Sequence, residues 1–239
     1  MNKIIQGDCI ELIKQIPSNS IDLITTDPPY NIGQDNKRTK VGDKIVINKE
    51  AWGEWDNMEK KGYEEFFTNY LKECFRILKD GGVMYCFSAR EDSGYYIHKA
   101  VDIGFTPLNM LAIIKDNPLP HFAKCGYRSA FELCFYLCKG KKPKTFNFLS
   151  QRECINTFNY LIGKKDTSHP TEKPLKFFER IIRISSNEGD VVFDGFMGSG
   201  TTAVACIKLN RKYIGFEISQ DYIKIAESRI KPYLEQKKL

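Results

Sequence analysis

Residues 21–30, with the sequence IDLITTDPPY, determine how the rest of the chain is arranged. The first six are mostly apolar or β-branched, a pattern typical of a buried strand. Pro28 and Pro29 have fixed φ angles and no backbone N–H donors, so the strand must end at Asp27. A carboxylate, free carbonyl acceptors and the Tyr30 ring therefore lie together at the carboxyl end of a strand.

This turn is suited to a flat heteroaromatic ring that carries an amino group. Asp27 and the Pro28 carbonyl oxygen can each accept a hydrogen bond from an exocyclic NH2, and Tyr30 offers a face for stacking. An isolated DPP sequence is more often an Asx-type turn with a tyrosine packed behind it. The turn alone leaves both interpretations open.

Length and composition indicate one catalytic domain over residues 1–239. A chain of 239 residues with 42% hydrophobic content can bury the core of an α/β domain. It contains no apolar run long enough to span a bilayer and no signal-peptide core, so we expect a cytoplasmic protein that does not contact membranes. The net charge of +6 favours a polyanionic partner without requiring one.

The cysteines and histidines do not form a metal-binding pattern. None of the eight cysteines belongs to a CxxC pair, and most lie in apolar segments where a small thiol packs well. The three histidines are not spaced as ligand partners. We therefore expect reduced, structural cysteines and no metal.

Apolar segments alternate along the chain in strand and helix periods. We expect strands at 3–6, 21–26, 83–87, 108–114, 131–138, 190–193 and 213–216, and helices at 9–15, 63–79, 91–101 and 175–185. Glycines 81 and 82 are expected to end the second helix. This order predicts an α/β fold with a doubly wound, mostly parallel sheet and an antiparallel hairpin at its edge.

Two polar segments interrupt this alternation. Residues 31–60 lack periodicity and contain Trp52 and Trp55, so we expect a mobile loop over the substrate. Residues 139–168 combine basic and aromatic side chains, which favours nucleic-acid contact, although a surface excursion with its own small cluster fits equally well. We interpret 139–168 as a short target-recognition segment.

A second set of functional residues surrounds the glycines in DGFMGSGTT, residues 194–202. A strand, a glycine turn and a helix start form a nest of backbone donors suited to a carboxylate or phosphate. Glu217 follows the turn by about twenty residues, as does the ribose-binding acid of dinucleotide folds. GxGxxG and the Walker lysine are missing, which favours S-adenosylmethionine over a nucleoside triphosphate, with a structural turn as the alternative. Asp8 lies at a strand–helix junction, where it is either a ligand or a helix cap.

Six motifs together resemble a known family. GDCIELIK, DLITTDPPYNIG, RILKDGGVMYCF, HPTEKPLKFFERII, DGFMGSGTTAVA and KYIGFEIS are similar, in this order, to the β group of amino-methylating DNA methyltransferases. The resemblance is strongest to the adenine N6 enzymes of restriction-modification systems. It implies a circularly permuted class I methyltransferase fold, S-adenosylmethionine as cofactor and DNA as partner. A cognate restriction endonuclease and a second copy of the chain are the protein partners it suggests.

The resemblance also implies roles for individual residues. Asp27, Pro28, Pro29 and Tyr30 form the target-base site. Asp8 binds the adenine amino group of the cofactor, Glu217 binds its ribose hydroxyls, and residues 169–174 together with the glycine turn hold its methionine part. The implied cofactor-binding residues are Asp8, Cys9, His169, Thr171, Lys173, Asp194, Phe196, Gly198, Ser199, Gly200, Thr201, Thr202 and Glu217.

Asp27 bears on the choice of base, because many cytosine N4 enzymes of the family have serine at this position. The expected function is therefore a site-specific DNA adenine N6 methyltransferase that acts on a flipped-out adenine. The alternatives are cytosine N4 or RNA methylation on the same scaffold, and a non-catalytic nucleic-acid-binding module. Gly195 stands where the family usually has proline, and we expect Gly195→Pro to hold or tighten cofactor binding.

Overall fold

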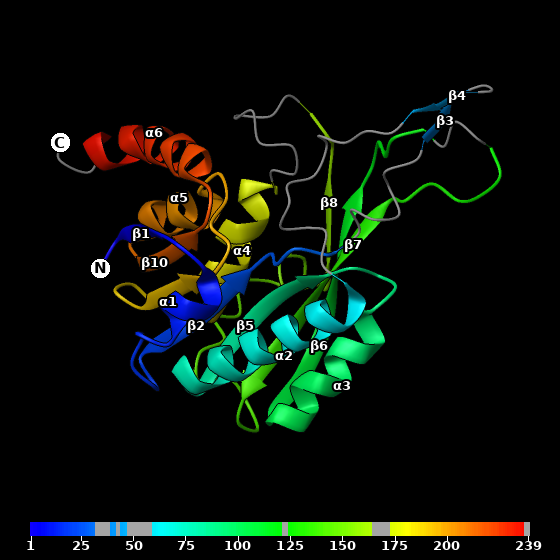
Figure 1. The fold of residues 1–239 in the computed structure, drawn as a ribbon. Helices are drawn as coiled ribbons and strands as arrows, with labels where there is room; N and C mark the ends of the chain where they lie inside the picture. Colours follow the sequence, from blue (N-terminus) through cyan, green and yellow to red (C-terminus); the bar gives the residue numbers. More distant parts are fainter. Residues whose placement is uncertain (32–38, 42–43, 47–58, 121–123, 164–172, 237–239) are drawn as a thin grey trace.

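The computed structural model describes residues 1–31, 39–41, 44–46, 59–120, 124–163 and 173–236 (Figure 1). Within these residues, eight strands form one sheet in the order β1-β10-β9-β2-β5-β7-β6-β8. Their bounds are β1 (Lys3–Gln6), β2 (Ile21–Thr26), β5 (Leu78–Ser88), β6 (Phe105–Lys115), β7 (Phe131–Lys139), β8 (Thr157–Tyr160), β9 (Val191–Asp194) and β10 (Lys212–Glu217).

The strand directions give the sheet two distinct edges. Each neighbouring pair from β1 to β5 is parallel, β7 is antiparallel to both β5 and β6, and β8 is parallel to β6. All strands of this sheet except β7 therefore run in the same direction. We call the edge where β2, β9 and β10 end the C-terminal edge, and the opposite one the N-terminal edge. Ligands of open α/β sheets bind outside the C-terminal edge.

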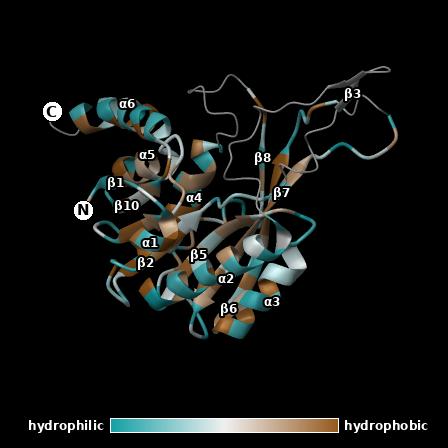
Figure 2. Ribbon diagram, in the orientation of Figure 1, coloured by the Kyte–Doolittle hydropathy of each residue, from teal (hydrophilic) through white to brown (hydrophobic). Residues whose placement is uncertain are grey.

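Helices cover both faces of the sheet (Figure 1). α1 (Cys9–Ile13), α2 (Lys60–Ile77) and α3 (Ser93–Ile103) pack on one face, and α4 (Leu175–Ser185), α5 (Thr201–Lys208) and α6 (Gln220–Gln236) on the other. Adjacent residues of β2 point into different cores, since Leu23 packs with α4 and α5 and Ile24 with α1 and α2. Hydrophobic segments follow the interior of both layers (Figure 2). The predicted doubly wound sheet is confirmed.

The start of β5 differs from the prediction. The helix ends at Ile77, and Gly81 and Gly82 lie inside the strand that follows it. The register against β2 shifts between the pairs Ile21↔Leu78 and Leu23↔Val83, so a bulge separates them. Gly81 has a φ angle of +74°, which only glycine adopts readily, and this explains the glycine within the strand.

The two polar segments are only partly described. Of residues 31–60, β3 (Thr39–Val41) and β4 (Lys44–Val46) form a separate antiparallel hairpin, while Trp52 and Trp55 lie outside the described residues. The segment 139–168 contains β8, which the sequence did not predict. β8 adds outside the β6–β7 hairpin, so that hairpin lies one strand inside the edge of the sheet.

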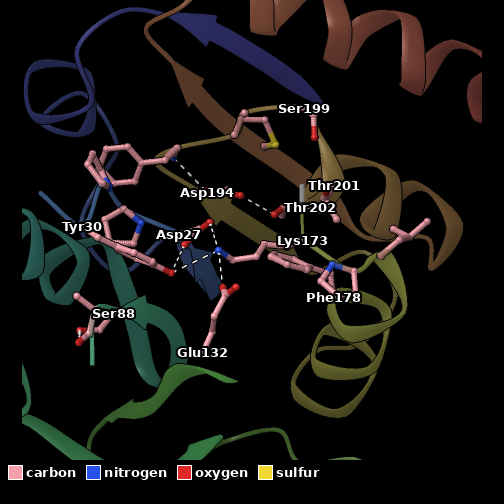
Figure 3. Close-up of a pocket in the computed structure, with 18 of the residues that line it drawn as sticks. Asp27, Tyr30, Ser88, Glu132, Lys173, Phe178, Asp194, Ser199, Thr201 and Thr202 are labelled. Atoms are coloured by element: carbon pink, nitrogen blue, oxygen red, sulfur yellow. Dashed lines mark hydrogen bonds and ion pairs between the residues drawn. The ribbon is translucent and has the colours of Figure 1, made fainter. Parts of the chain in front are cut away.

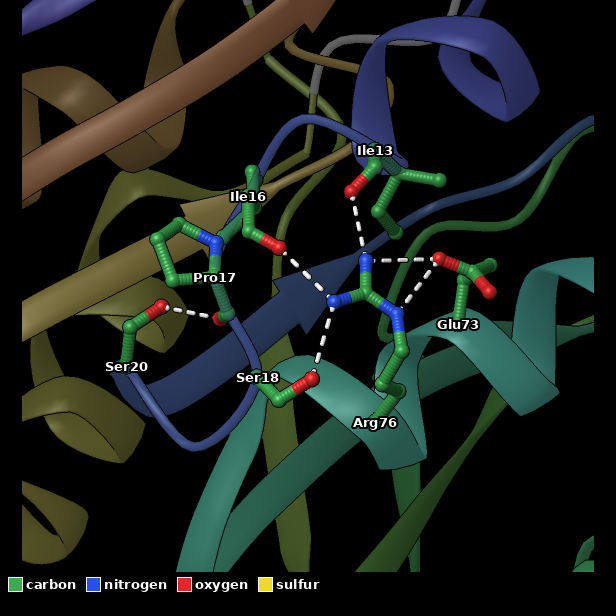
Figure 4. A network of polar contacts seen from close by, with 7 residues as sticks. All are labelled: Ile13, Ile16, Pro17, Ser18, Ser20, Glu73 and Arg76. Carbon is green, nitrogen blue, oxygen red and sulfur yellow. Dashed lines mark hydrogen bonds and ion pairs between the residues drawn. The ribbon is translucent and has the colours of Figure 1, made fainter.

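Arg76, in the last turn of α2, fixes the end of α1 (Figure 4). Its guanidinium donates to the carbonyl oxygens of Ile13 at 2.9 Å and Ile16 at 2.8 Å, and Glu73 accepts from Nε and Nη2 at 2.9 and 2.7 Å. Carbonyl groups at a helix end lack partners within the helix. Arg76 thereby anchors one end of α1, whose other end carries Asp8.

In the described part of the chain, no helix combines the length and apolar character needed to cross a membrane.

Candidate active site

A cleft of about 1520 Å³ opens at the C-terminal edge of the sheet. The cleft brings together the turn after β1, the turn after β2, the glycine turn after β9 and the end of β10. Figure 3 shows Asp27 and Tyr30 of the second turn beside Asp194 and Thr202 of the third. β2 and β9 are far apart in sequence but pair directly, with Leu23 opposite Val192 and Ile24 opposite Phe193. The DPPY turn and the glycine turn therefore lie side by side. His169 and Thr171 lie outside the described residues.

The glycine turn is organised by Asp194, the last residue of β9. Its Oδ1 accepts a hydrogen bond from the Phe196 N–H at 3.0 Å, and its Oδ2 accepts one from the Thr202 hydroxyl at 2.5 Å. Burial raises the pKa of Asp194 to about 7, although both hydrogen bonds oppose that shift. Gly198 and Gly200 have φ angles of +51° and +81°, so the turn requires glycine at both positions.

Side chains from α6 and β2 hold this turn in place. The Ser199 and Thr201 hydroxyl oxygens accept hydrogen bonds from Arg229 of α6, at 3.2 and 2.9 Å. Thr202 accepts a long hydrogen bond of 3.4 Å from the hydroxyl of Thr25 in β2. The turn is thus connected to the strand that carries the DPPY residues.

Glu217 ends β10 beside the glycine turn. Its Oε2 accepts a hydrogen bond from the Gly198 N–H at 2.8 Å, and its Oε1 accepts one from the Ser219 N–H at 2.9 Å. Burial raises the pKa of Glu217, and these backbone hydrogen bonds oppose the shift. Each oxygen retains acceptor capacity for a further donor, such as a hydroxyl group.

Asp8 is both a helix cap and part of the cleft wall. Its Oδ1 accepts a hydrogen bond from the Glu11 N–H at 3.1 Å, which makes it the N-cap of α1. The same residue lines the cleft, with Cys9 beside it. The two interpretations offered by the sequence are therefore compatible, because one carboxylate oxygen caps the helix and the other remains as an acceptor.

The residues at this end of the cleft fit a nucleoside that carries a positive charge. Asp8, Asp194 and Glu217 place three carboxyl groups around it, and Ile218, with 56% of its surface exposed, adds an apolar face beside Glu217. Carboxylates accept hydrogen bonds from hydroxyl and amino groups, and they attract a sulfonium. The sequence prediction missed Ile218, although an apolar residue directly after the predicted ribose ligand was a usable signal.

The DPPY turn is held rigidly by neighbouring hydroxyl groups. The Tyr30 hydroxyl donates to Asp27 Oδ1 at 2.7 Å, and the Tyr63 hydroxyl donates to the Pro29 carbonyl oxygen. One residue before the turn, the buried Thr26 hydroxyl shares a hydrogen bond of 2.7 Å with Tyr70. All four residues of the turn line the cleft.

Lys173 contacts the DPPY turn. Its Nζ lies 2.8 Å from Asp27 Oδ2 and 2.8 Å from Glu132 Oε2, and it donates to the Tyr30 hydroxyl at 3.4 Å (Figure 3). Burial disfavours the charged form of Lys173, but Asp27 and Glu132 more than offset this and raise its pKa above the usual range. The resemblance instead implied a contact with the methionine part of the cofactor.

Glu132 and Lys115 belong to the same group of charges and were missed by the sequence prediction. The Lys115 Nζ lies 2.6 Å from Glu132 Oε1. Burial alone raises the pKa of Glu132, yet Lys173 and Lys115 lower it to about 2. A glutamate inside the apolar run FELCFYLC was a signal, because a buried carboxylate requires partners.

Gly195 is closely surrounded, which contradicts the expectation for Gly195→Pro. A Cβ atom at this position lies 2.7 Å from the Tyr70 hydroxyl and 2.8 Å from the Cys9 Sγ. Real Cβ atoms essentially never approach other atoms this closely. A proline ring therefore requires both neighbours to move, so the substitution is expected to weaken the turn.

The first part of segment 139–168 lies at the N-terminal edge, away from the cleft. Lys139 donates to the Leu78 carbonyl oxygen at 2.9 Å, and the Lys144 N–H donates to Gly81 at 2.8 Å. The end of β8 returns to the cleft, where Asn117 and Ile162 exchange two hydrogen bonds, of 2.8 and 2.6 Å. Among the described residues of the segment, those that line the cleft are 158–163.

The fold and its cleft define the class of protein. A mostly parallel sheet with one antiparallel strand, a glycine turn after a central strand and an acid at the next strand end form the class I methyltransferase fold. The DPPY turn comes before the glycine turn along the chain, which is the circularly permuted order of this fold. The class is therefore an S-adenosylmethionine-dependent methyltransferase.

Comparison with known proteins gives the family. The model of the N6/N4 methyltransferase family, described as DNA methylase, matches residues 21–228, and the chain belongs to this family. It is 34% identical to the type II methyltransferase M.HinfI of Haemophilus influenzae over 97% of this chain and 68% of that protein. Identity to the type II methyltransferase M.HpaI of Haemophilus parainfluenzae is 30%, over 95% of this chain and 74% of that protein. The crystal structure of the M1.HpyAVI–SAM complex superimposes with a TM-score of 0.74 and 27% identity, covering 95% and 98% of the two chains.

Proposed function

We propose that this DNA methyltransferase acts on the N6 amino group of a specific adenine in DNA. The observation that carries the proposal is the Asp27 carboxylate, fixed at the end of β2 beside the glycine turn and open to the cleft. The family includes both N6 and N4 enzymes, so the fold does not select the base. Aspartate at the first position of the DPPY motif, where many cytosine N4 enzymes have serine, favours adenine.

The acceptor nitrogen must be made more nucleophilic, because its lone pair is delocalised into the ring. Asp27 and the Pro28 carbonyl oxygen accept hydrogen bonds from the two amino protons and localise that lone pair on nitrogen. S-adenosylmethionine, when bound, supplies an electrophilic methyl group on a sulfonium. The acceptor nitrogen would take this methyl carbon as the sulfonium sulfur leaves as a thioether, and the amino group would release one proton to water.

Binding divides between the two ends of the cleft. Asp8, Glu217 and the glycine turn would hold the cofactor, and the DPPY turn would hold the base, whose ring stacks on Tyr30. A base inside a duplex cannot reach this turn, so the target adenine must be flipped out. We further propose that DNA lies across the C-terminal edge, near the end of β8.

The two related proteins are named type II methyltransferases, which supports placing this chain in a restriction-modification system. A cognate endonuclease that reads the same DNA sequence is the partner this implies. A homodimer is the second partner we propose, to be tested by light scattering of the purified protein.

The test is mass spectrometry of nucleosides after incubation of the protein with unmethylated DNA and methyl-labelled S-adenosylmethionine. Labelled N6-methyladenine is the expected product, and Asp27→Ala should abolish it while cofactor binding is retained. Labelled N4-methylcytosine would refute the choice of base. Absence of any labelled nucleoside from DNA, with the cofactor bound, would refute DNA as substrate and direct the assay to RNA.

A further inference from the structure

We infer that Lys173 and Glu132 position the Asp27 carboxylate for the acceptor base, and that Lys173 does not bind the methionine carboxylate of the cofactor. This inference rests on the role proposed for Asp27. Both side chains line the cleft, and we assign them the role of positioning residues because Lys173 pairs directly with Asp27 and Glu132 pairs with Lys173.

The first argument is the geometry of four charged side chains of alternating sign. Asp27, Lys173, Glu132 and Lys115 form a chain of ion pairs with distances of 2.8, 2.8 and 2.6 Å. Asp27 directly follows β2, Lys173 lies just before α4, Glu132 is in β7, and Lys115 is the last residue of β6. Glu132 lies opposite Ile113, and Lys115 is two residues further along β6, so it points to the same face. Two positive and two negative charges balance each other.

The second argument is that Lys173 has little freedom to leave this position. Its side chain is only 11% exposed, and its Nζ also lies 5.3 Å from the centre of the Tyr30 ring and 4.9 Å from that of Phe87. Lys173 is followed by α4, in which Phe177 and Phe178 are buried in the core. Moving a buried ammonium away from two carboxylates leaves uncompensated charges behind. The described contacts of Nζ are with the target-base turn, β5 and β7.

The third argument concerns the carboxylate itself. Oδ1 accepts a hydrogen bond from the Tyr30 hydroxyl, and Oδ2 forms an ion pair with Lys173. These two contacts fix the plane of the Asp27 carboxylate. Each oxygen keeps acceptor capacity for one more donor, so the base need not displace Lys173. The Lys173 ammonium also places a positive charge 2.8 Å from this carboxylate. Asp27 is thereby prepared to accept the amino hydrogen bond, with Glu132 holding Lys173 from the other side.

The first test compares Lys173→Met with Lys79→Met. Lys79 is a matched control, since its Nζ pairs with Asp22, also on β2, at 2.6 Å, but at the N-terminal edge. For Lys173→Met we expect kcat on DNA to fall about 100-fold, as misplaced catalytic groups typically cause, with the calorimetric Kd for S-adenosylmethionine within about twofold of wild type. Lys79→Met should change neither value. A Kd raised about tenfold or more, with kcat retained, would overturn the inference.

The second test uses Glu132→Gln, which preserves shape and removes one charge. Lys173 Nζ then loses the carboxylate that lies 2.8 Å away on the side opposite Asp27. The variant should therefore lower kcat on DNA, with the calorimetric Kd for S-adenosylmethionine within about twofold of wild type, whereas a general structural defect would weaken cofactor binding as well. A kcat equal to that of wild type would overturn the role of Glu132. If wild type methylates no DNA, the proposed function fails, and calorimetry of Lys173→Met still decides whether Lys173 binds the cofactor.

Discussion

Replacement of Gly195 by alanine tests how closely the glycine turn packs on α1 and α2. The added Cβ meets three atoms closer than 3.0 Å, namely the Tyr70 hydroxyl at 2.7 Å, the Cys9 Sγ at 2.8 Å and the Tyr70 Cε2 at 2.9 Å. Tyr70 is buried and hydrogen-bonded to Thr26, so it cannot rotate away without leaving a buried hydroxyl unpaired. Overpacking of this kind typically costs about 1–3 kcal/mol.

The expected result is a loss of about 1–3 kcal/mol in the free energy of unfolding for Gly195→Ala, and at least as much for Gly195→Pro. Urea denaturation measures this loss, and calorimetry with S-adenosylmethionine should show weaker binding, because the same turn lines the cofactor end of the cleft. Combining Gly195→Ala with Cys9→Ala removes one of the short contacts. The stability loss of the double variant should be smaller than the sum of the two single losses by at least about 0.5 kcal/mol, as expected for residues in contact.

Two outcomes would refute this reasoning. One is a Gly195→Pro variant that is as stable as wild type and binds the cofactor equally well, since the turn then follows another backbone path. The other is strict additivity of Gly195→Ala and Cys9→Ala, which would show that the two residues do not touch. Gly94, where an added Cβ meets nothing within 4 Å, supplies the matched control as Gly94→Ala.

Three further predictions concern stability and DNA binding. Arg76→Met should lower the free energy of unfolding by about 1–3 kcal/mol in urea denaturation, because buried carbonyl groups at the end of α1 lose their donor. Asp194 has a folded-state pKa of about 7, above that of an ordinary carboxyl, so the stability it contributes is present below about pH 4 and is lost as the pH rises through 7. Urea denaturation between about pH 4 and pH 7 should therefore show the free energy of unfolding of wild type falling relative to that of Asp194→Asn. A difference between the two proteins that does not change with pH would contradict the raised pKa. The double variant Lys141→Glu, Lys142→Glu should keep the KM for DNA within about twofold of wild type, with an unchanged salt dependence, because both lysines follow β7 at the N-terminal edge. A large rise in this KM would place DNA on that edge.

Much of the fold and the positions of the main turns could be predicted from local sequence. Two prolines after an apolar run located the end of β2, and the helix predicted at residues 175–185 has the bounds of α4 in the structure. The rule that ligands bind at strand ends then placed the DPPY turn and the glycine turn at one edge. These features depend on residues close together in the chain, which is why patterns revealed them.

Contacts between distant strands were not predictable in the same way. The partners of Lys173 depend on Glu132 lying opposite Ile113, and no local pattern encodes that register. Lys139 is the last residue of β7. Because β7 runs opposite to the other strands of the sheet, this residue lies at the N-terminal edge. The bulge at Gly81 and the close packing at Gly195 likewise come from tertiary neighbours. Gly81, predicted to end a helix, instead allows a bulge in β5, and Gly195, predicted to make the turn flexible, instead leaves room for Tyr70 and Cys9.

The position of β9 between β2 and β10 has a consequence for synthesis of the protein. As the chain leaves the ribosome, β2 can pair with β5 early, but its other edge stays open until Val191–Asp194 has been made. Non-local pairing of this kind slows folding, and an unpaired apolar strand edge promotes aggregation in the meantime. A nascent chain that already carries the whole DPPY turn therefore still depends on its last strands, and chaperone binding is expected to be greatest just before β9 emerges.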